Sequence, residues 1–359
     1  MPIKVLVVDD SSLMRRLITR FLEEDPGIKV IDTAADGEEA IRKIQSQRPD
    51  VVTLDVEMPV LDGLATLGRV MRNFPLPVIM LSAHTTEGAR ATMQALSLGA
   101  VDFVAKPAKA GEMEVMVADL KYKVRAAAQA LLRRPAAAPA RPAAKPQPAA
   151  AHPQTAQIKG LSPAPGKGKI EVVVIGSSTG GPAALQQIIP ALPGNLPAGV
   201  VIVQHIPKGF SGPMAEHLDR KSGLKVKHAD QGDRVAPGLV LVAPAGYDLT
   251  FRRAAGSLTV NLDPGSAPVP PGGFRPSVDV VMKSAAEVIR SQAMGVLLTG
   301  MGRDGAQGML AIRSEKGPTV AEAESSCVVF GMPRAAIEIG GADKVLPLQE
   351  IAGEIVRTV

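Results

Sequence analysis

The sequence predicts an α/β protein of two domains, each with a doubly wound, mostly parallel sheet, and a β-hairpin appended to the second sheet. Three observations predict this fold. Short apolar strands alternate with helical patterns in both halves of the chain. Polar side chains follow the ends of several strands, as they do at the ligand-binding edge of such a sheet. The chain has 359 residues, which exceeds one ordinary core, and a proline-rich segment divides it.

The first half contains five predicted strands separated by helical patterns. Between the first two strands, apolar residues recur at i, i+3, i+4 and i+7, namely at Met14, Leu17, Ile18 and Phe21. Five such units predict a parallel sheet that is covered by helices on both faces. The predicted strands are Ile3–Val8, Lys29–Thr33, Val51–Leu54, Val78–Leu81 and Val101–Val104.

Polar residues follow the strands of this first domain. Asp9 and Asp10 follow the first strand and Asp55 follows the third, while Ser82 and Lys106 follow the fourth and the fifth. Carboxylates gathered at one sheet edge repel each other unless a cation is bound, and Mg²⁺ prefers such oxygen ligands. The pattern therefore predicts a site that binds Mg²⁺ and accepts a phosphoryl group on one carboxylate.

A basic segment at 126–169 predicts a linker between a domain at 1–125 and a domain at 170–359. From Arg133 to Ile170 there are seven Lys and Arg residues and no Asp or Glu, and subtracting these from the net charge of +5 leaves about −2 elsewhere. Alanine and proline make up half of this stretch, which cannot pack a core. It contains no interleaved aromatic residues, so we expect no nucleic-acid partner.

The composition favours a cytoplasmic protein. Cys327 is the one cysteine, so no intramolecular disulfide can form, which fits a reducing compartment. The chain begins with a strand and reaches Asp9 and Asp10 too early for a signal peptide. No apolar run approaches the length of a membrane span, so we expect no insertion into a membrane.

The second half opens on a strand that breaks into a serine turn. Val172–Ile175 is apolar, and the spacing Gly176-x-Ser178-x-Gly180 follows it. Small residues on both sides of Ser178 suit a tight strand-to-helix turn that exposes a nucleophilic hydroxyl. Glycine-rich turns after strands also bind phosphate without doing chemistry, so a nucleotide- or phosphate-binding module is the alternative.

Two further strands in this half end in residues that could act with Ser178. His205 follows Val200–Gln204, and Asp304 follows Gly295–Leu298 within a few residues. Parallel strands share one carboxyl edge, so His205 could serve as general base and Asp304 could orient its imidazole. The order Ser, His, Asp differs from that of the α/β-hydrolases. Between His205 and Asp304 in the chain, apolar and polar residues alternate over residues 240–262, which predicts β-hairpins appended to the sheet.

Residues 1–125 resemble a response-regulator receiver domain, which has a flavodoxin-like fold. The resemblance rests on Asp9-Asp10, on Leu54-Asp55-Val56-Glu57-Met58-Pro59, on Leu81-Ser82-Ala83, and on Phe103 and Lys106-Pro107. It implies that Asp55 is phosphorylated by a chemotaxis histidine kinase, with Mg²⁺ held by Asp9, Asp10 and Asp55. It further implies that Ser82, Phe103 and Lys106 form the switch and that Pro107 follows a cis peptide bond.

Residues 170–359 resemble the catalytic domain of chemotaxis receptor protein-glutamate methylesterases. The matching motifs are Ile175-Gly176-Ser177-Ser178-Thr179-Gly180-Gly181, Gln204-His205-Ile206-Pro207, Arg275-Pro276-Ser277-Val278-Asp279, Leu298-Thr299-Gly300-Met301-Gly302-Arg303-Asp304-Gly305-Ala306 and Phe330-Gly331-Met332-Pro333. The resemblance implies Ser178 as nucleophile, His205 as base, Asp304 as orienting acid and the Met301 N–H as an oxyanion donor. The family commonly has alanine where this chain has Ser177, which we interpret as a tolerated small residue.

Together the two resemblances imply a phosphorylation-regulated serine hydrolase. Its substrates would be methylated glutamates on chemoreceptors in chemotaxis adaptation, and it would also deamidate receptor glutamines. Ester hydrolysis would need no cofactor, and we expect a monomer. The receiver domain would cover the hydrolase cleft until Asp55 is phosphorylated. A peptidase or small-molecule esterase with the same three residues is the other alternative, because no specificity pocket can be recognised in the sequence.

Overall fold

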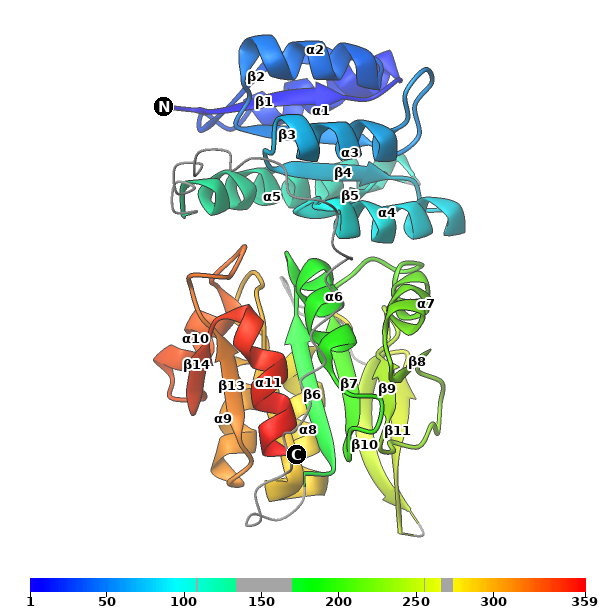
Figure 1. Cartoon of the computed structure of the whole chain (residues 1–359), viewed down its shortest axis with the longest axis vertical. Coiled ribbons are helices and arrows are strands. Elements are labelled where there is room, and N and C mark those ends of the chain that lie inside the picture. Colours follow the sequence, from blue (N-terminus) through cyan, green and yellow to red (C-terminus); the bar gives the residue numbers. More distant parts are fainter. Residues whose placement is uncertain (108, 134–169, 255, 266–273) are drawn as a thin grey trace, which may run out of the picture.

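The computed structural model contains two α/β domains and describes residues 1–107, 109–133, 170–254, 256–265 and 274–359. Most of the predicted linker, 134–169, lies outside these residues. Figure 1 shows the N-terminal domain stacked on one end of the C-terminal domain, beside helices α6 and α7. No helix in the described ranges combines the length and the apolarity that a bilayer span requires.

The N-terminal domain has the five-stranded parallel sheet that the sequence predicts, in the order β2-β1-β3-β4-β5. Alternate residues of its strands face opposite layers. Val5 and Val7 pack with α1 and α5, whereas Leu6 and Val8 pack in the cluster that contains α2, α3 and α4. The strands are β1 (Ile3–Val8), β2 (Ile28–Ala34), β3 (Val51–Asp55), β4 (Val78–Ser82) and β5 (Asp102–Ala105), and the helices are α1 (Ser12–Glu23), α2 (Gly37–Gln47), α3 (Gly63–Asn73), α4 (Thr86–Leu98), η1 (Ala110–Glu112) and α5 (Met113–Arg133).

Local sequence explains where helices α1 to α4 begin and why α5 continues past position 125. Side chains cap α1 to α4 by accepting a backbone N–H of the first turn, and they belong to Ser11, Asp36, Asp62 and Thr85. Helix α5 continues to Arg133, past position 125, where the sequence predicted the domain to end. Residues 126–128 are alanines, the strongest helix formers, and they are buried against the domain.

The C-terminal domain has a seven-stranded parallel sheet in the order β14-β13-β12-β6-β7-β9-β8, and a separate antiparallel pair, β10-β11. Helices α6, α7 and α11 cover one face, and α8, α9 and α10 cover the other together with the hairpin. The sheet strands are β6 (Val172–Ser177), β7 (Gly199–Gln204), β8 (Lys225–His228), β9 (Leu239–Val242), β12 (Ala293–Leu297), β13 (Thr319–Glu322) and β14 (Lys344–Leu346), and the hairpin strands are β10 (Asp248–Ala254) and β11 (Ser257–Asp263). The helices are α6 (Gly181–Ala191), α7 (Ser211–Lys221), α8 (Val278–Ile289), η2 (Arg290–Gln292), α9 (Ala306–Ser314), α10 (Met332–Glu338) and α11 (Leu348–Thr358).

The predicted hairpin region divides between two structures. Val240 belongs to β9, which pairs in parallel with β7 and β8, whereas the antiparallel pair begins only at Asp248. Val240, Leu241 and Val242 are all fully buried, so a continuous apolar run in a two-sided core replaces the alternation of a half-exposed strand. The hairpin therefore covers the sheet rather than extending it.

The order of the strands in the second sheet reverses at β6. From β6 the chain moves to β7 on one side, and it returns later as β12 on the other side. Ligands of doubly wound sheets bind where the order of strands reverses in this way, outside the carboxyl ends. Ser178, His205 and the segment after Leu297 all lie at this edge.

We expect Ile175→Ala to destabilise the C-terminal domain strongly, because Ile175 is fully buried in the central strand β6. Truncating such a side chain leaves a cavity and costs about 2–5 kcal/mol of unfolding free energy. Val345→Ala is the control, since Val345 is 46% exposed on the edge strand β14. Urea unfolding followed by circular dichroism measures both, and equal losses would contradict the assignment of β6 as the core strand.

Candidate active site

The turn after β6 begins at Ser178, whose carbonyl oxygen accepts the Gly181 N–H at 2.8 Å. Gly180 precedes α6 in the left-handed region, with φ +78°. A Cβ atom on Gly176 would lie 2.3 Å from Val278 Cγ1, and one on Gly180 would lie 2.7 Å from Val328 Cβ. Close packing therefore requires glycine at both positions, which explains the spacing Gly176-x-Ser178-x-Gly180.

The two adjacent serines have different surroundings. Ser177 is fully buried and its hydroxyl donates to Gln204 Oε1 at 2.6 Å. Gln204 Nε2 in turn donates to the carbonyl oxygens of Ser178, at 2.9 Å, and of His205, at 2.8 Å. Ser178 is 7% exposed, and among the described residues its hydroxyl has no hydrogen-bond partner. The Ser177 hydroxyl therefore stabilises the turn through Gln204, while the Ser178 hydroxyl has no hydrogen bond within the described residues.

The side chains of His205 and Asp304 are in contact. His205 Nε2 lies 2.8 Å from Asp304 Oδ2. Asp304 also accepts the hydroxyl of Ser277 and the backbone N–H groups of Val278 and Asp279, at the N-terminus of α8. Burial alone would raise the pKa of Asp304, but the hydrogen bonds and charge of His205 and the N–H donors outweigh it and lower the pKa. Asp304 is therefore a carboxylate at neutral pH and accepts from His205.

The surroundings of the His205 ring face and of its second nitrogen, Nδ1, are also visible in the structure. The Phe274 ring stacks on His205 with centroids 4.1 Å apart and planes 12° apart. His205 Nδ1 is buried and has no partner in the described part of the chain. Because Asp304 receives the Nε2 proton, the free lone pair of a neutral His205 lies on Nδ1. No hydrogen bond joins His205 to the Ser178 hydroxyl among the described residues, so the structure brings the two residues to one edge without linking their side chains.

The segment after β12 packs directly against the serine turn. Thr299 O accepts the Ser178 N–H at 3.1 Å. A Cβ atom on Gly300 would lie 2.8 Å from Ser178 Cβ, so only glycine permits this approach. Met301, the predicted oxyanion donor, follows on this segment, and its side chain is 41% exposed. Its backbone therefore lies within two residues of the contacts to Ser178.

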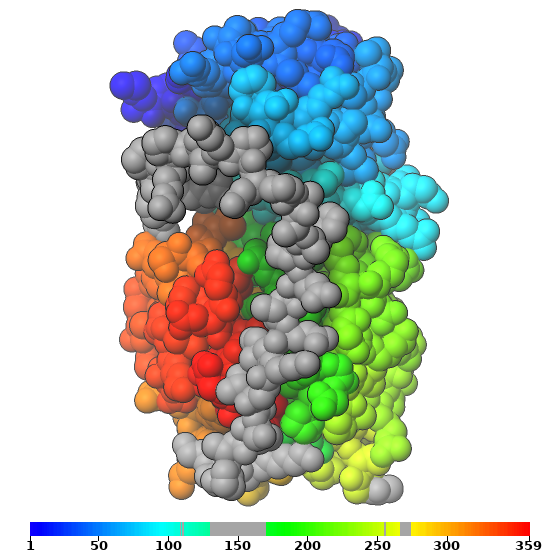
Figure 2. Space-filling model, viewed as in Figure 1, coloured from blue at the N-terminus to red at the C-terminus, as the bar shows by residue number. Residues whose placement is uncertain are grey.

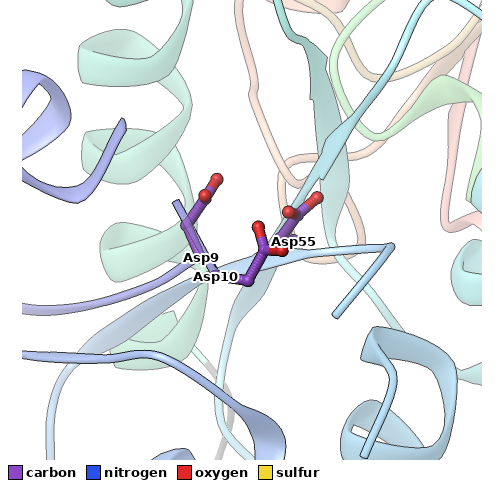
Figure 3. Close-up of side chains that lie close together, drawn as sticks. All are labelled: Asp9, Asp10 and Asp55. Carbon is purple, nitrogen blue, oxygen red and sulfur yellow. The ribbon is translucent and has the colours of Figure 1, made fainter. Parts of the chain in front are cut away.

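The acidic residues of the N-terminal domain form one cluster. Asp9, Asp10 and Asp55 each offer an oxygen atom within 4.8 Å of the others, and Figure 3 shows their side chains grouped together. Lys106 Nζ lies 2.8 Å from Asp9 Oδ2 and 2.6 Å from Asp55 Oδ2. Burial raises the pKa of Asp55 to about 6, against the lowering effect of Lys106. Three hard oxygen donors fit the coordination preferences of Mg²⁺.

The predicted switch residues lie on the neighbouring strands. Ser82 ends β4 and is fully buried, and Phe103 lies on β5 with 2% exposure. The prediction of a cis bond before Pro107 is wrong, because the cis bond in the described residues is Arg275–Pro276. The cis and trans forms of an X–Pro bond differ by only about 0.5–1 kcal/mol, so sequence alone does not decide between them.

Phe103 and its neighbour Asp102 connect the two domains. Phe103 stacks on Phe210 of the C-terminal domain with centroids 4.7 Å apart. Asp102 is 3% exposed, and its Oδ2 accepts the N–H of Gly180 at 3.1 Å, two residues after Ser178. A carboxylate from the first domain thus occupies an N–H donor at the start of α6 in the second.

Helix α4 extends this junction over α6 and α7. Ser97 Oγ lies 3.0 Å from His217 Nε2, and Arg90 Nη2 lies 3.0 Å from Glu216 Oε2. Figure 2 shows the α4 surface, in cyan, meeting the yellow-green surface of α7. Burial and the adjacent Lys221 lower the pKa of His217 to about 4, so this histidine is neutral at physiological pH.

Sequence reasoning missed several residues that shape the site. Gln204 and Ser277 stood inside the quoted motifs, but nothing in the sequence showed that they hold the serine turn and Asp304. Asp102 and Phe274 carried no signal, because their partners are distant in the chain. Arg275, which could have met a partner or formed an ion pair, lies 2.8 Å from Asp248 Oδ2.

Comparisons with known proteins agree for both domains. The CheB methylesterase family model matches residues 173–355, and the response regulator receiver domain model matches residues 5–118. The protein-glutamate methylesterase/protein-glutamine glutaminase of Symbiobacterium thermophilum is 48% identical over the whole of this chain and 97% of its own length. The protein of the same name from Archaeoglobus fulgidus is 45% identical over 99% of this chain and 97% of its own.

A solved structure supports the second domain. The crystal structure of the Thermotoga maritima CheB methylesterase catalytic domain is 43% identical, covers 53% of this chain and 98% of its own, and aligns with a TM-score of 0.51. The predicted fold of both domains and the family expected from the motifs are therefore confirmed. This chain belongs to the protein-glutamate methylesterase family, with an N-terminal response-regulator receiver domain and a C-terminal CheB methylesterase domain.

Proposed function

We propose that this protein hydrolyses γ-glutamyl methyl esters on the cytoplasmic helices of chemoreceptors and deamidates receptor glutamines. The observation that carries the proposal is the His205–Asp304 pair, which lies at the same sheet edge as Ser178, whose hydroxyl has no hydrogen-bond partner among the described residues. The names of relatives that are 45% and 48% identical over 97% of their own length support the choice of substrate. We further propose that the protein acts in the cytoplasm as a monomer.

In the mechanism that fits this geometry, Ser178 Oγ attacks the ester carbonyl while His205 Nδ1 takes its proton. The carbon–oxygen bond to Ser178 forms, and the oxyanion accepts hydrogen bonds from backbone donors that include the Met301 N–H. The bond to methoxide then breaks, and the imidazolium returns the proton so that methanol leaves. Water hydrolyses the acyl-enzyme by the same route. With a glutamine substrate the leaving group is ammonia.

Asp304 acts in both half-reactions through His205. Its lowered pKa keeps it ionised, so it holds the Nε2 proton and stabilises the imidazolium. Five donors fix the carboxylate itself, and they come from His205, Ser277, Val278, Asp279 and Gly305. Phe274 restrains the ring from one face. The base is therefore preorganised by residues that need not touch the substrate.

The receiver domain supplies regulation through Asp55, the proposed phosphoryl acceptor. Asp9, Asp10 and Asp55 would hold Mg²⁺, which offsets the negative charge of the incoming phosphoryl group when bound. Lys106, which contacts Asp9 and Asp55, adds a second positive charge. A chemotaxis histidine kinase is the proposed phosphodonor.

We propose that the unphosphorylated receiver keeps the esterase inactive by covering its site. The contact of Asp102 with the Gly180 N–H and the stacking of Phe103 on Phe210 support this, because both lie next to the serine turn or the start of α7. Phe103 follows Asp102 on β5, whose neighbour β4 ends at Ser82. Phosphorylation of Asp55 would shift the population toward an open arrangement.

Ser178→Ala should abolish methanol release from methylated receptor, whereas Ser177→Ala should retain most of it. The first change removes the proposed nucleophile, and the second removes a buried hydrogen bond worth about 0.5–1.5 kcal/mol of stability. Methanol release in the presence of a phosphodonor measures both. If Ser177→Ala were the inactive variant, the assignment of the nucleophile would be wrong.

His205→Ala and Asp304→Asn should each lower turnover by several orders of magnitude, roughly 10⁴-fold for the loss of the orienting carboxylate in other triads. Asp279→Asn is the matched control, because Asp279 also lies at the start of α8 but accepts from Gly308 instead of His205. Steady-state turnover measures all three variants. Unchanged turnover in Asp304→Asn would remove Asp304 from the mechanism.

Glu216→Arg should raise the activity of the unphosphorylated protein, because it sets like charges face to face at the junction of α4 and α7. Combining it with Arg90→Glu reverses both charges and should restore the low activity. The comparison of the single and double variants separates opening of the junction from damage to α7. Methanol release without phosphodonor is the measurement.

Two further variants test regulation by the receiver domain, with methanol release as the measurement. Asp55→Asn should block activation by a phosphodonor and leave basal turnover intact, because Asp55 takes no part in ester chemistry. Deleting residues 1–133 should raise activity above that of the unphosphorylated whole. A truncated protein that is no faster would rule out occlusion and leave stimulation or receptor recruitment as the effect of phosphorylation.

A further inference from the structure

Glu322 is a buried carboxylic acid that the proposed reaction does not use. It ends β13 and is fully buried, and no Lys or Arg in the described part of the chain pairs with it. Burial raises its pKa, although donors from Thr299, Ser326 and Cys327 act in the opposite direction. Burying an acid without a cation costs stability, so its position calls for a physical reason.

The hydrogen bonds of Glu322 lead directly to the serine turn. Oε2 accepts the Thr299 N–H at 2.8 Å, and Oε1 accepts the Ser326 hydroxyl at 2.9 Å. Thr299 then contacts the turn twice, since its carbonyl accepts the Ser178 N–H at 3.1 Å and its hydroxyl donates to Thr179 O at 3.0 Å. A single residue therefore separates Glu322 from both backbone contacts of the turn.

Thr299 also begins the segment that carries the proposed oxyanion donor. The ladder between β12 and β13 ends with Leu297 opposite Ala321, so the Thr299 N–H lies beyond the regular pairing. The Glu322 side chain replaces a main-chain acceptor there. Met301 follows Thr299 by two residues. The hydrogen bond between Thr299 and Glu322 therefore restrains one end of the segment that contains Met301.

We propose that Glu322 is a positioning residue for the esterase, which fixes Thr299 and through it both the Ser178 turn and the Met301 backbone. The inference rests on the proposed roles of Ser178 and Met301. Errors of about 1 Å in the relative position of reacting groups can cost roughly 100-fold in rate. Loss of the anchor would misplace the nucleophile against the oxyanion donor without removing either.

The role needs an acceptor for the Thr299 N–H rather than a negative charge. A glutamine can present its amide oxygen to Thr299 and its amide hydrogens to Ser326 Oγ, and the Ser326 hydroxyl can turn to Ala323 O, 3.3 Å away. Glu322→Gln should therefore keep the anchor, whereas Glu322→Ala removes it and leaves the Thr299 N–H unpaired. The two variants separate positioning from charge.

The test measures kcat and KM for methylated receptor with the full-length protein and a saturating phosphodonor. We expect Glu322→Ala to lower kcat about 10- to 100-fold with KM changed less than about twofold, and Glu322→Gln to restore most of kcat. Glu354→Ala is the matched control, because Glu354 is also a buried acid of this domain but pairs with Lys344 and Arg357. Its kcat should stay near that of the native protein at temperatures where it is folded.

If Glu322→Ala does not fold, Ser326→Ala tests the same anchor by a smaller change. It removes the donor to Glu322 Oε1 and should lower kcat several-fold with KM unchanged, while Ser314→Ala on the exposed side of α9 should have no effect. Equal kcat values for the Glu322 and Glu354 variants, or no rescue by glutamine, would overturn the proposal. Ser178→Ala in the same assay tests the proposed function separately, since activity in that variant would refute the nucleophile itself.

Discussion

The shared carboxyl edge of three adjacent parallel strands is the constraint on which the rest of the active site depends. In the sheet register Ser177 is opposite Gln204, and Gly176 is opposite Leu297. Residues that follow these positions therefore leave the sheet side by side, although they are far apart in the chain. Main-chain and amide hydrogen bonds from Thr299 and Gln204 then fix the serine turn between its neighbours.

Three buried carboxylates in the protein illustrate how local donors decide the charge of an acid. Burial opposes ionisation of Asp55, Asp304 and Glu322 alike. Asp304 has His205 and several N–H donors, and its pKa is lowered. Asp55 has Lys106 but also the repulsion of Asp9, and its pKa is raised to about 6. This difference fits the proposed orienting role of Asp304 and the proposed cation-binding role of the Asp55 cluster.

Residues of the junction between the domains lie close in the chain to the predicted switch residues of the first domain and contact residues near Ser178 in the second. Asp102 and Phe103 lie on β5 beside β4, which carries Ser82, and they contact Gly180 and Phe210 in the other domain. The exposed Arg90–Glu216 pair is worth little by itself, since surface ion pairs contribute about 0–1 kcal/mol. The buried stacking of Phe103 on Phe210 and the hydrogen bond of Asp102 at the start of α6 therefore define the junction more than the exposed ion pair does.

The sequence by itself determined the two α/β domains, the parallel sheets and the edge at which polar residues gather. Apolar runs followed by Asp9, Asp55, Ser178 and His205 are local patterns, and strand ends in a parallel sheet converge regardless of detail. Helix α5 extends past position 125, where the sequence predicted the first domain to end, and Val240, which the sequence predicted to lie in a hairpin, belongs to β9. Packing decides whether an alanine run continues a helix and whether an apolar run joins a sheet. The tertiary structure alone decided the supporting contacts. Asp102 with Gly180, Phe274 with His205, and Glu322 with Thr299 each join residues that only the folded chain brings within a hydrogen bond or a ring contact, so no spacing in the sequence could reveal them.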